Sequence, residues 1–359
     1  MKFPKVRSLR IGGKADAELN EFAQSMKPVS LWADAWRRLR KNKMALAGLF
    51  IVAFYVAAVL LAPILPIYHY EDQVISHANL PPSLRPAGEV MLETRVAYMR
   101  KMMKAESRTS FNAKEEADIE AMKADIKVNP DHKRVYVMGT DNLGRDLLSR
   151  TIYGGRISIM IGLVGTITAT LVGILLGSIA GYTGGKIDNF IMRFVDILYG
   201  LPYMLVVIIM MAIFGKNVIN LFVAIALVSW LTLARVVRGQ VMSLKNAEFI
   251  EAARSMGASP ARIVFRHLTP NTLGVIVVFA TLLVPDFIMS ESFLSFLGLG
   301  VSAPLASWGS LVSEGTATME LYPWQLLVPA ISMTLFLFAM NFLGDGLRDA
   351  LDPQSKNRA

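Results

Sequence analysis

The sequence predicts an all-α integral membrane protein with six transmembrane helices. Hydrophobic residues make up 53% of the 359 residues and charged residues only 18%, whereas soluble domains usually carry about a quarter charged residues. The apolar residues are gathered into runs that are long enough to cross a bilayer, which takes roughly 20 residues per helix. No run alternates apolar and polar residues strongly enough to predict a sheet. A soluble globular fold is therefore not the starting expectation.

Six charge-free stretches are the candidate spans, and the fifth of them continues past Asp286. They are 44–70, 157–185, 197–215, 217–234, 267–285 and 321–344. These spans divide the chain into five expected parts. The parts are a cytoplasmic tail with an interfacial helix (1–43), the first span (44–67), an outer loop with a helical insertion (68–156), a core transmembrane domain (157–346) that includes an inner loop (246–270), and a cytoplasmic tail (347–359).

The first 43 residues predict a cytoplasmic segment that ends in an interfacial helix. They contain eleven Lys or Arg residues and no short apolar core followed by a small-residue cleavage site, so they are not a signal peptide. Over 30–41, one helical face is apolar and the other carries arginines. The apolar face holds Leu31, Trp32, Ala35, Trp36 and Leu39. Two tryptophans beside a span favour a helix in the inner interface over a solvated helix packed on a partner.

The distribution of positive charge predicts that both termini are cytoplasmic. The inner segment 235–266 carries six Lys or Arg residues, whereas the short outer loops hold only Lys216. This asymmetry follows the positive-inside rule. The loop 68–156 is also rich in basic residues, but it is longer than the roughly 60 residues over which the rule is counted. We therefore expect that loop to lie outside.

The outer loop predicts a small helical hairpin. The spacing of its apolar residues favours helices over 89–105 and 113–127. Asn112 precedes the second helix, and Glu115 stands three residues later. This spacing predicts an N-cap with a capping box, in which each of the two side chains accepts a hydrogen bond from the other residue's backbone N–H.

The motifs of an enzyme or of an ATP-binding pump are absent from the sequence. The absence of cysteine excludes disulfides, thiolate metal sites and a cysteine nucleophile. The four histidines are scattered without the spacing of metal ligands. No P-loop, G-x-S-x-G or H-E-x-x-H pattern occurs. We therefore expect neither a cofactor nor a metal in this chain, and we attribute its net charge of +9 to contact with membrane lipid rather than with nucleic acid.

Two acidic residues near the outer end of the fifth span are candidates for a translocation path or an outer gate, because ionisable groups inside a membrane are costly. Asp286 lies about 15 residues into the span, or roughly 22 Å at 1.5 Å per residue. Glu291 follows near the outer boundary. The alternative is that both acids form hydrogen bonds within the bundle. Separately, Asp196 is expected to pair with Arg193, one helical turn away.

The inner loop 246–270 predicts two short helices joined by a tight turn below the membrane. We expect a first helix over 248–256, a break over 257–260, and a second helix over 261–267 that stops at Pro270. The alternative is a plain solvated loop between two spans, but such a loop rarely needs helix caps and breaks. The candidate contact residues are Glu251, Ala252, Ala253, Arg254, Gly257 and Arg262.

This loop resembles the EAA loop in the permease subunits of ATP-binding-cassette (ABC) importers. The matching residues are Glu251, Ala252, Ala253, Gly257, Ile263 and Pro270. Other segments resemble signatures of the C-type permeases of oligopeptide, dipeptide and nickel importers. They are MGTDNLGRDLLSRTIYGGRIS from Met138, ESFLSFLGLG from Glu291, SWG at 307–309 and NFLGDGLRDALDP from Asn341. The resemblance is nearly continuous over 139–353 and departs over about 68–138, where family members usually have a shorter loop.

The resemblance implies a type I ABC importer permease fold and a multi-pass subunit of a bacterial plasma (inner) membrane. It implies a homologous second permease subunit, two ATPase subunits and an extracytoplasmic solute-binding protein as partners. The ATPase subunits would bind ATP and Mg, so this chain would not be an enzyme. Its loop 246–270 would couple ATPase closure to alternating access. Peptides are the expected substrate, and nickel complexes are the alternative.

Two functions of other classes are weaker hypotheses. A secondary transporter or channel would need ion-coordinating broken helices or inverted repeats, and neither is evident in the sequence. A receptor or scaffold would show no ATP-dependent uptake.

Overall fold

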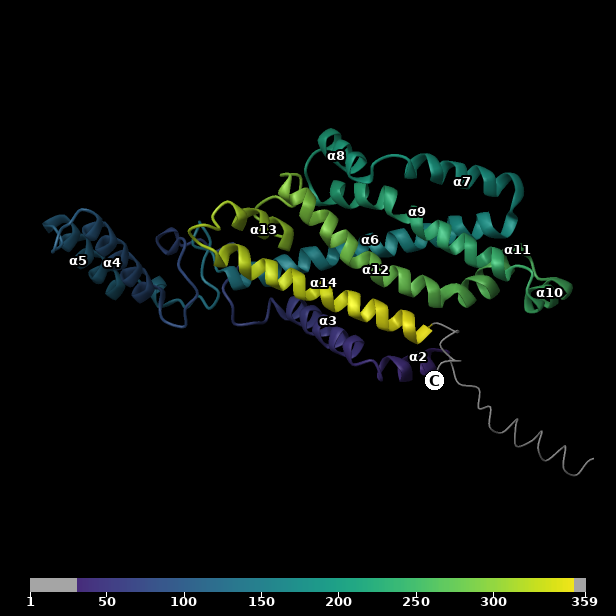
Figure 1. The fold of residues 1–359 in the computed structure, drawn as a ribbon, viewed down its shortest axis with the longest axis horizontal. Coiled ribbons are helices and arrows are strands. Elements are labelled where there is room, and N and C mark those ends of the chain that lie inside the picture. Colours follow the sequence, from purple (N-terminus) through teal and green to yellow (C-terminus); the bar gives the residue numbers. More distant parts are fainter. Residues whose placement is uncertain (1–30, 352–359) are drawn as a thin grey trace, which may run out of the picture.

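The computed structural model describes residues 31–351, and within that range it contains helices and loops but no β-strand. The expected tail 1–29 and most of the expected tail 347–359 lie outside the described residues. Five long helices, α3, α6, α9, α12 and α14, run side by side and form the body (Figure 1). The pair α4 and α5 extends from one end of this body, and α10 and α2 lie near the other (Figure 1).

The helices comprise long apolar elements, the polar pair α4 and α5, and shorter connecting elements. In chain order they are α2 (Leu31–Leu39), α3 (Lys43–Leu61), η1 (Ile75–His77), α4 (Ala87–Ala105), α5 (Ala113–Val128), η2 (Pro130–Lys133), α6 (Leu147–Thr183), α7 (Gly185–Tyr199), α8 (Tyr203–Phe214), α9 (Val218–Leu244), α10 (Glu248–Ser255), α11 (Pro260–Arg262), η3 (Ile263–Leu268), α12 (Thr269–Phe296), α13 (Trp308–Thr316) and α14 (Trp324–Leu351).

The third expected span, 197–215, is not a single straight helix. Among the described residues, five helical segments are long and apolar enough to cross a membrane, and the number reaches six only if α7 and α8 together form one span. These two helices meet at an angle of 79°. Pro202 precedes α8 and lacks a backbone N–H, so the chain cannot continue regular helical hydrogen bonding through this turn. The sequence analysis did not anticipate this broken span.

Helix α6 lies at the centre of the body because its small residues let neighbouring helices approach closely. Gly173, Gly177 and Gly181 form a stripe along the side that faces α9. A Cβ atom at Gly177 would lie 2.5 Å from the backbone oxygen of Ala234, and one at Gly181 would lie 2.8 Å from that of Arg238. Small residues at intervals of four allow such backbone contact between membrane helices. The stripe therefore fixes α9 against α6.

An aromatic cluster holds α3, α13 and α14 together. Trp308, at the start of α13, is 1% exposed, and its ring centroid lies 5.6 Å from that of Tyr55 and 5.4 Å from that of Phe336. Its indole N–H donates to the backbone oxygen of Thr151 in α6 (2.9 Å). The sequence analysis singled out the SWG run at 307–309 but did not predict a helix there. Ser307 caps this helix, and its hydroxyl accepts from Ser310 N.

The prediction that a second short helix of the inner loop stops at Pro270 is wrong. Helix α11 continues through η3, a π-helical turn, into α12, so a single helical segment runs over Pro260–Phe296. The N–H of Thr269 donates to Val264 O, five residues back. A wider turn of this kind relieves the clash between the proline ring and the carbonyl four residues earlier. The inner loop is therefore rigidly continuous with the span that follows it.

The segment predicted to be an interfacial helix is helical as α2, and it packs on the end of α14. Ala35 and Leu39 are buried together with Ala45 and Ala350, while Trp36 is 44% exposed. The guanidinium of Arg40 lies 4.8 Å from the centre of the Trp36 ring. One face of α2 is thus covered by the protein, and Trp36 remains free to contact the membrane interface.

The predicted helical hairpin forms, with α4 and α5 packed against each other. The capping box is confirmed, because Glu115 N donates to the Asn112 side chain (2.8 Å) and Asn112 N donates to the Glu115 carboxylate (2.8 Å). Arg108, in the turn between the helices, pairs with Glu115 (2.9 Å) and with Glu106 (2.7 Å). The tip of the hairpin is therefore closed by charge-assisted hydrogen bonds.

Two buried histidines join the base of the hairpin to the loop that precedes it. His132 Nε2 donates to Asp125 Oδ2 (2.9 Å), because a carboxylate can only accept. His132 Nδ1 and His77 Nε2 share a hydrogen bond (2.8 Å), and His77 Nδ1 shares another with the Tyr136 hydroxyl (3.0 Å). Both rings are buried, with exposed fractions of 0% for His77 and 1% for His132.

We expect acid to destabilise the base of the hairpin. Burial, assisted by the nearby His132, lowers the pKa of His77 to about 4. The unfolded chain has a histidine pKa of about 6.5, so the stability conferred by neutral His77 is complete above that pH and is lost as the pH falls toward 4. The loss is on the order of 2–3 kcal/mol of local opening free energy. Hydrogen exchange over 75–136 at pH 7 and pH 4.5, corrected for intrinsic rates, measures it.

Two substitutions identify the group that titrates. His77→Gln keeps one donor and one acceptor without titrating, so it should flatten the pH dependence. His69→Gln alters an exposed histidine and should leave the dependence unchanged. Equal protection of wild type at the two pH values would contradict the assignment.

Candidate functional site

The expected protrusion of the inner loop is built from α10 and a left-handed glycine that ends it. Gly257 has φ +81°, a backbone conformation that non-glycine residues rarely adopt. Its N–H donates to Arg254 O (3.0 Å), and Ala258 N donates to Ala253 O (3.1 Å). This pair of bonds is the Schellman arrangement, which fixes the direction in which the chain leaves a helix. Gly257 therefore sets the angle between α10 and α11.

Buried apolar residues attach α10 firmly to the transmembrane helices. Ile250 is 0% exposed and Ala253 3% exposed. Ile250 belongs to a cluster that joins α9, η3 and α12. Its other buried members are Leu233, Val237, Val241, Ile263, Val264, Leu268 and Ile276. Because closely packed interiors transmit strain, this packing couples α10 mechanically to these helices.

The predicted contact residues divide between the two sides of this protrusion. Ala253 faces the protein, so its small side chain lets α10 lie close to the bundle rather than to a partner. The other five are exposed: Glu251, Ala252, Arg254, Gly257 and Arg262. A Cβ atom at Gly257 would meet nothing within 4 Å in this chain. The exposed surface of α10 and the following turn is therefore free for a partner, and we call it the α10 face.

Sequence reasoning missed three exposed apolar residues on or near the α10 face. Phe249 is 41% exposed, Met256 80% and Phe265 53%. The sequence contained a signal for them, namely large apolar side chains within a polar, basic loop. Exposed apolar groups of this kind mark contact sites. They add apolar contact area to the charged residues predicted from the motif.

Two ion pairs join α7 to α9. Asp188 accepts from Arg238 Nε (2.5 Å), and Asp196 accepts from Arg235 Nη2 (2.7 Å). The expected pairing of Asp196 with Arg193 is replaced by this contact between helices. The Arg235 guanidinium also lies 4.2 Å from the centre of the Tyr199 ring. The inner half of the broken span is thereby held along α9.

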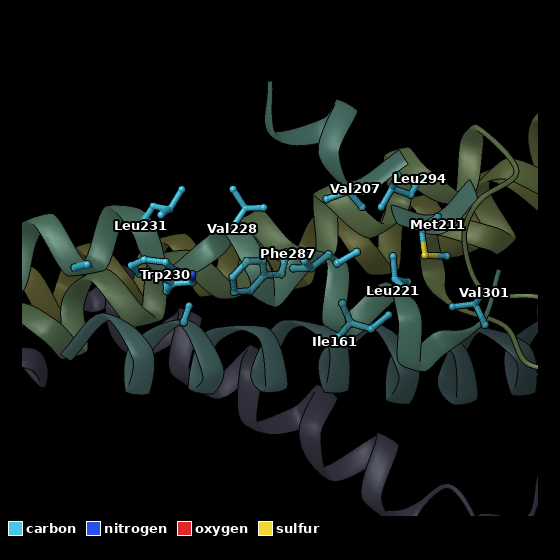
Figure 2. Packing of buried hydrophobic residues seen from close by; sticks show 14 of the residues in the cluster. Ile161, Val207, Met211, Leu221, Val228, Trp230, Leu231, Phe287, Leu294 and Val301 are labelled. Carbon is cyan, nitrogen blue, oxygen red and sulfur yellow. The ribbon is translucent and has the colours of Figure 1, made fainter. Parts of the chain in front are cut away.

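A cavity of about 700 Å³ lies within the membrane body, between the α7–α8 turn, α9 and α12. It is lined by Leu198, Tyr199, Leu201, Pro202, Tyr203, Met204, Val228, Ser229, Leu231, Thr232, Leu283, Asp286, Phe287, Met289 and Ser290. Figure 2 shows Val228, Leu231 and Phe287 within the apolar packing from which these walls are built. The cavity thus combines an apolar lining with five hydroxyl side chains and one carboxylate.

The two predicted acidic residues lie in different surroundings. Asp286 is exposed in this chain and lines the cavity. Glu291 is 0% exposed, and its Oε1 accepts from the hydroxyls of Ser295 (2.6 Å) and Ser307 (2.6 Å). Because Ser307 also caps α13, Glu291 links α12 to the start of that helix.

A buried charge cluster near the outer end of α6 was not predicted. Asp141 Oδ2 accepts from Arg145 Nε (2.6 Å) and from Arg150 Nη1 (2.7 Å). Arg150 also pairs with Glu314 of α13 (2.7 Å). The side chains of Asp141, Arg145 and Arg150 are 6%, 8% and 1% exposed. These contacts tie the end of the outer loop to α6 and α13.

Within residues 31–351, no group of three or more His, Asp or Glu side chains is placed to hold a metal ion. The α10 face can receive another protein. The cavity can hold a small solute that carries polar or positive groups.

Comparison with known proteins gives two family matches. Residues 173–357 match the model described as "binding-protein-dependent transport system inner membrane component". Residues 30–82 match the model described as "N-terminal TM domain of oligopeptide transport permease C".

Individual relatives are similar over nearly the whole chain. The oligopeptide transport system permease protein OppC of Haemophilus influenzae is 42% identical over 91% of this chain and 90% of its own length. The dipeptide transport system permease protein DppC of Bacillus subtilis is 40% identical over 94% of this chain and 91% of its own. OppC of Escherichia coli is 42% identical over 91% of this chain and 92% of its own length. A chain in a solved structure of the MetNI methionine ABC transporter in inward-facing conformations is 19% identical to this chain, with a TM-score of 0.46. The match covers 57% of this chain and 96% of the MetNI chain.

Proposed function

Since the chain belongs to the family of binding-protein-dependent transport system inner membrane components and has their type I ABC permease fold, we propose that it carries oligopeptides or dipeptides into the cell. The support is its identity of 38–42% to oligopeptide and dipeptide permease proteins over most of its length. Its relatives are permease subunits and not enzymes, so hydrolysis of ATP belongs to separate ATPase subunits.

The proposed assembly needs three kinds of partner. A homologous second permease would cover the side of the cavity that this chain leaves open. Two ATPase subunits, which bind ATP and Mg, would contact the α10 faces. A solute-binding protein would deliver peptide to the outer ends of the spans. Both termini and the α10 face would then be cytoplasmic, in agreement with the excess of basic residues in the inner segments.

The proposed coupling between the α10 face and the cavity is supported by the buried cluster that lies between them. On α9, Leu233 of this cluster directly follows Thr232, which lines the cavity. On α12, Ile276 stands seven residues before the lining residue Leu283, a rise of about 10 Å. A displacement of α10 would therefore reach two walls of the cavity through rigid helices. This is how closure of ATPase subunits would switch the permease between inward-facing and outward-facing states.

The two alternative functions have less support. The relatives named above are peptide permeases, so transport of nickel complexes is not favoured. A secondary transporter would need coordinating groups for a driving ion, and the cavity offers one carboxylate.

Deletion of the gene tests the proposed function in the cell. In a strain that requires an amino acid, we expect deletion to abolish growth on a peptide that contains that amino acid. Growth on the free amino acid should be unaffected, because that solute enters by other routes. A plasmid copy of the gene should restore growth on the peptide. Loss of nickel accumulation with unchanged peptide uptake would instead support the alternative substrate.

A further inference from the structure

The cavity between α7, α8, α9 and α12 contains a single charged side chain. Among the fifteen lining residues, Asp286 is the only one with a formal charge. The polar groups around it are hydroxyls, from Tyr199, Tyr203, Ser229, Thr232 and Ser290. Asp286 stands ten residues before the end of α12, about 15 Å below the outer end of the helix. A carboxylate at that depth is costly to place in a membrane, and such a residue is therefore a candidate for a functional role.

No cation of the described chain neutralises this carboxylate. Within residues 31–351, no Lys, Arg or His lies within 4.0 Å of Asp286. Arg235, a cation beside the cavity, is already paired with Asp196 and stacked on the ring of Tyr199. Asp286 therefore differs from Asp188 and Asp196, whose charges are compensated by arginines of α9. The carboxylate is available to a positive group that enters the cavity.

We propose that Asp286 binds the α-ammonium group of a peptide as the peptide crosses the membrane, an inference that rests on the proposed function. Peptides of different sequence share only their backbone and their two charged ends. A lone negative charge attracts the ammonium end and repels the carboxylate end, so peptides would pass with their amino terminus at Asp286. The apolar remainder of the lining contacts varied side chains without selecting among them.

The neighbouring hydroxyls suit the other hydrogen bonds of an ammonium group. The Ser290 hydroxyl donates to the backbone oxygen of Asp286 (2.8 Å), which leaves its oxygen free to accept. Across the cavity, the hydroxyl oxygens of Tyr199 and Thr232 lie 3.4 Å apart. An ammonium group has three donors and no acceptor. One carboxylate and a few hydroxyl oxygens can therefore satisfy it without holding it so tightly that release is prevented.

The test compares two forms of one peptide in proteoliposomes that contain the complete transporter. The first form has a free amino terminus and the second an acetylated one, and the chosen peptide is one that the solute-binding protein binds in both forms. At saturating loaded binding protein, we expect wild type to import the free form about tenfold faster. Asp286→Asn should lower import of the free form about tenfold and that of the acetylated form less than twofold. Asp286→Glu should restore the preference.

Controls separate this role from a structural one. Asp345→Asn removes an exposed carboxylate of α14 that does not line the cavity, and it should change neither rate. Equal loss of both peptide forms in Asp286→Asn would overturn the proposal, because a structural carboxylate would affect both alike. An unchanged preference in Asp286→Asn would overturn it as well. A wild-type complex that imports neither form would instead overturn the proposed peptide transport, which is a different failure.

Discussion

Replacing Gly257 with valine is expected to lower ATP-dependent peptide uptake by at least tenfold while the protein remains in the membrane. At φ +81° a β-branched residue is strained, so the turn after α10 must change its direction. The cost to folding is limited to this strain, on the order of 1–2 kcal/mol, because a Cβ atom at Gly257 meets nothing in this chain. We expect the larger effect on the proposed seating of the α10 face on the ATPase. Uptake and co-purification of the ATPase subunits measure it.

The chain offers two controls for this prediction. Gly298 ends α12 with the same pair of hydrogen bonds, has φ +73°, and likewise has nothing within 4 Å of an added Cβ. Gly298→Val should therefore impose similar strain at the opposite end of the bundle and leave ATPase co-purification intact. Gly257→Asn should retain much of the uptake, because asparagine tolerates this conformation. Wild-type uptake by Gly257→Val would show that the α10 face does not couple.

Replacing Asp141 with alanine is expected to be the most destabilising single change at the outer surface. Asp141 Oδ2 accepts from both Arg145 and Arg150, and its Oδ1 accepts from the backbone N–H of Leu143 (2.8 Å) and of Arg145 (2.9 Å). Its loss leaves two buried arginines to share Glu314. Removing one partner from a buried ionic cluster costs about 3–5 kcal/mol. The thermal midpoint of the detergent-solubilised protein and its yield measure this loss.

Two matched variants separate the effect of losing the Asp141 charge from the effect of losing its hydrogen bonds to the backbone of the turn. Asp141→Asn keeps an acceptor for the backbone N–H groups but removes the charge, so its effect should be intermediate. Glu314→Gln changes a carboxylate that is 48% exposed, and it should cost no more than about 1 kcal/mol. If Asp141→Ala melts within a degree of wild type, the cluster does not hold the outer loop on α6 and α13.

Local sequence signals predicted the local structure. Asn112 and Glu115 are three residues apart and form the capping box, and Gly257 occupies the left-handed position that a helix end requires. The apolar runs predicted the long helices because a bilayer imposes their length. In each case the residues that form the sequence pattern also form the local structure. A single segment of sequence is therefore sufficient to predict that structure.

Features that depend on distant contacts could not be predicted in this way. Glu314 pairs with Arg150 across 164 positions of sequence. Asp196 had an arginine one turn away, yet its partner is Arg235 on another helix. At Pro270 the local rule predicted a helix end, but η3 accommodates the ring. Asp286 and Glu291 are five residues apart, and only tertiary packing places one in the cavity and the other inside the bundle.

We propose that this chain moves peptides with energy delivered through its α10 face from ATP bound elsewhere. The most direct measurement is uptake of a radiolabelled peptide by proteoliposomes that hold this chain, the second permease and the ATPase subunits, with the solute-binding protein outside and ATP inside. We expect uptake that stops when ATP or any one subunit is omitted and that falls at least tenfold with Gly257→Val. Uptake driven by an ion gradient without ATP, or undiminished without the ATPase subunits, would contradict it.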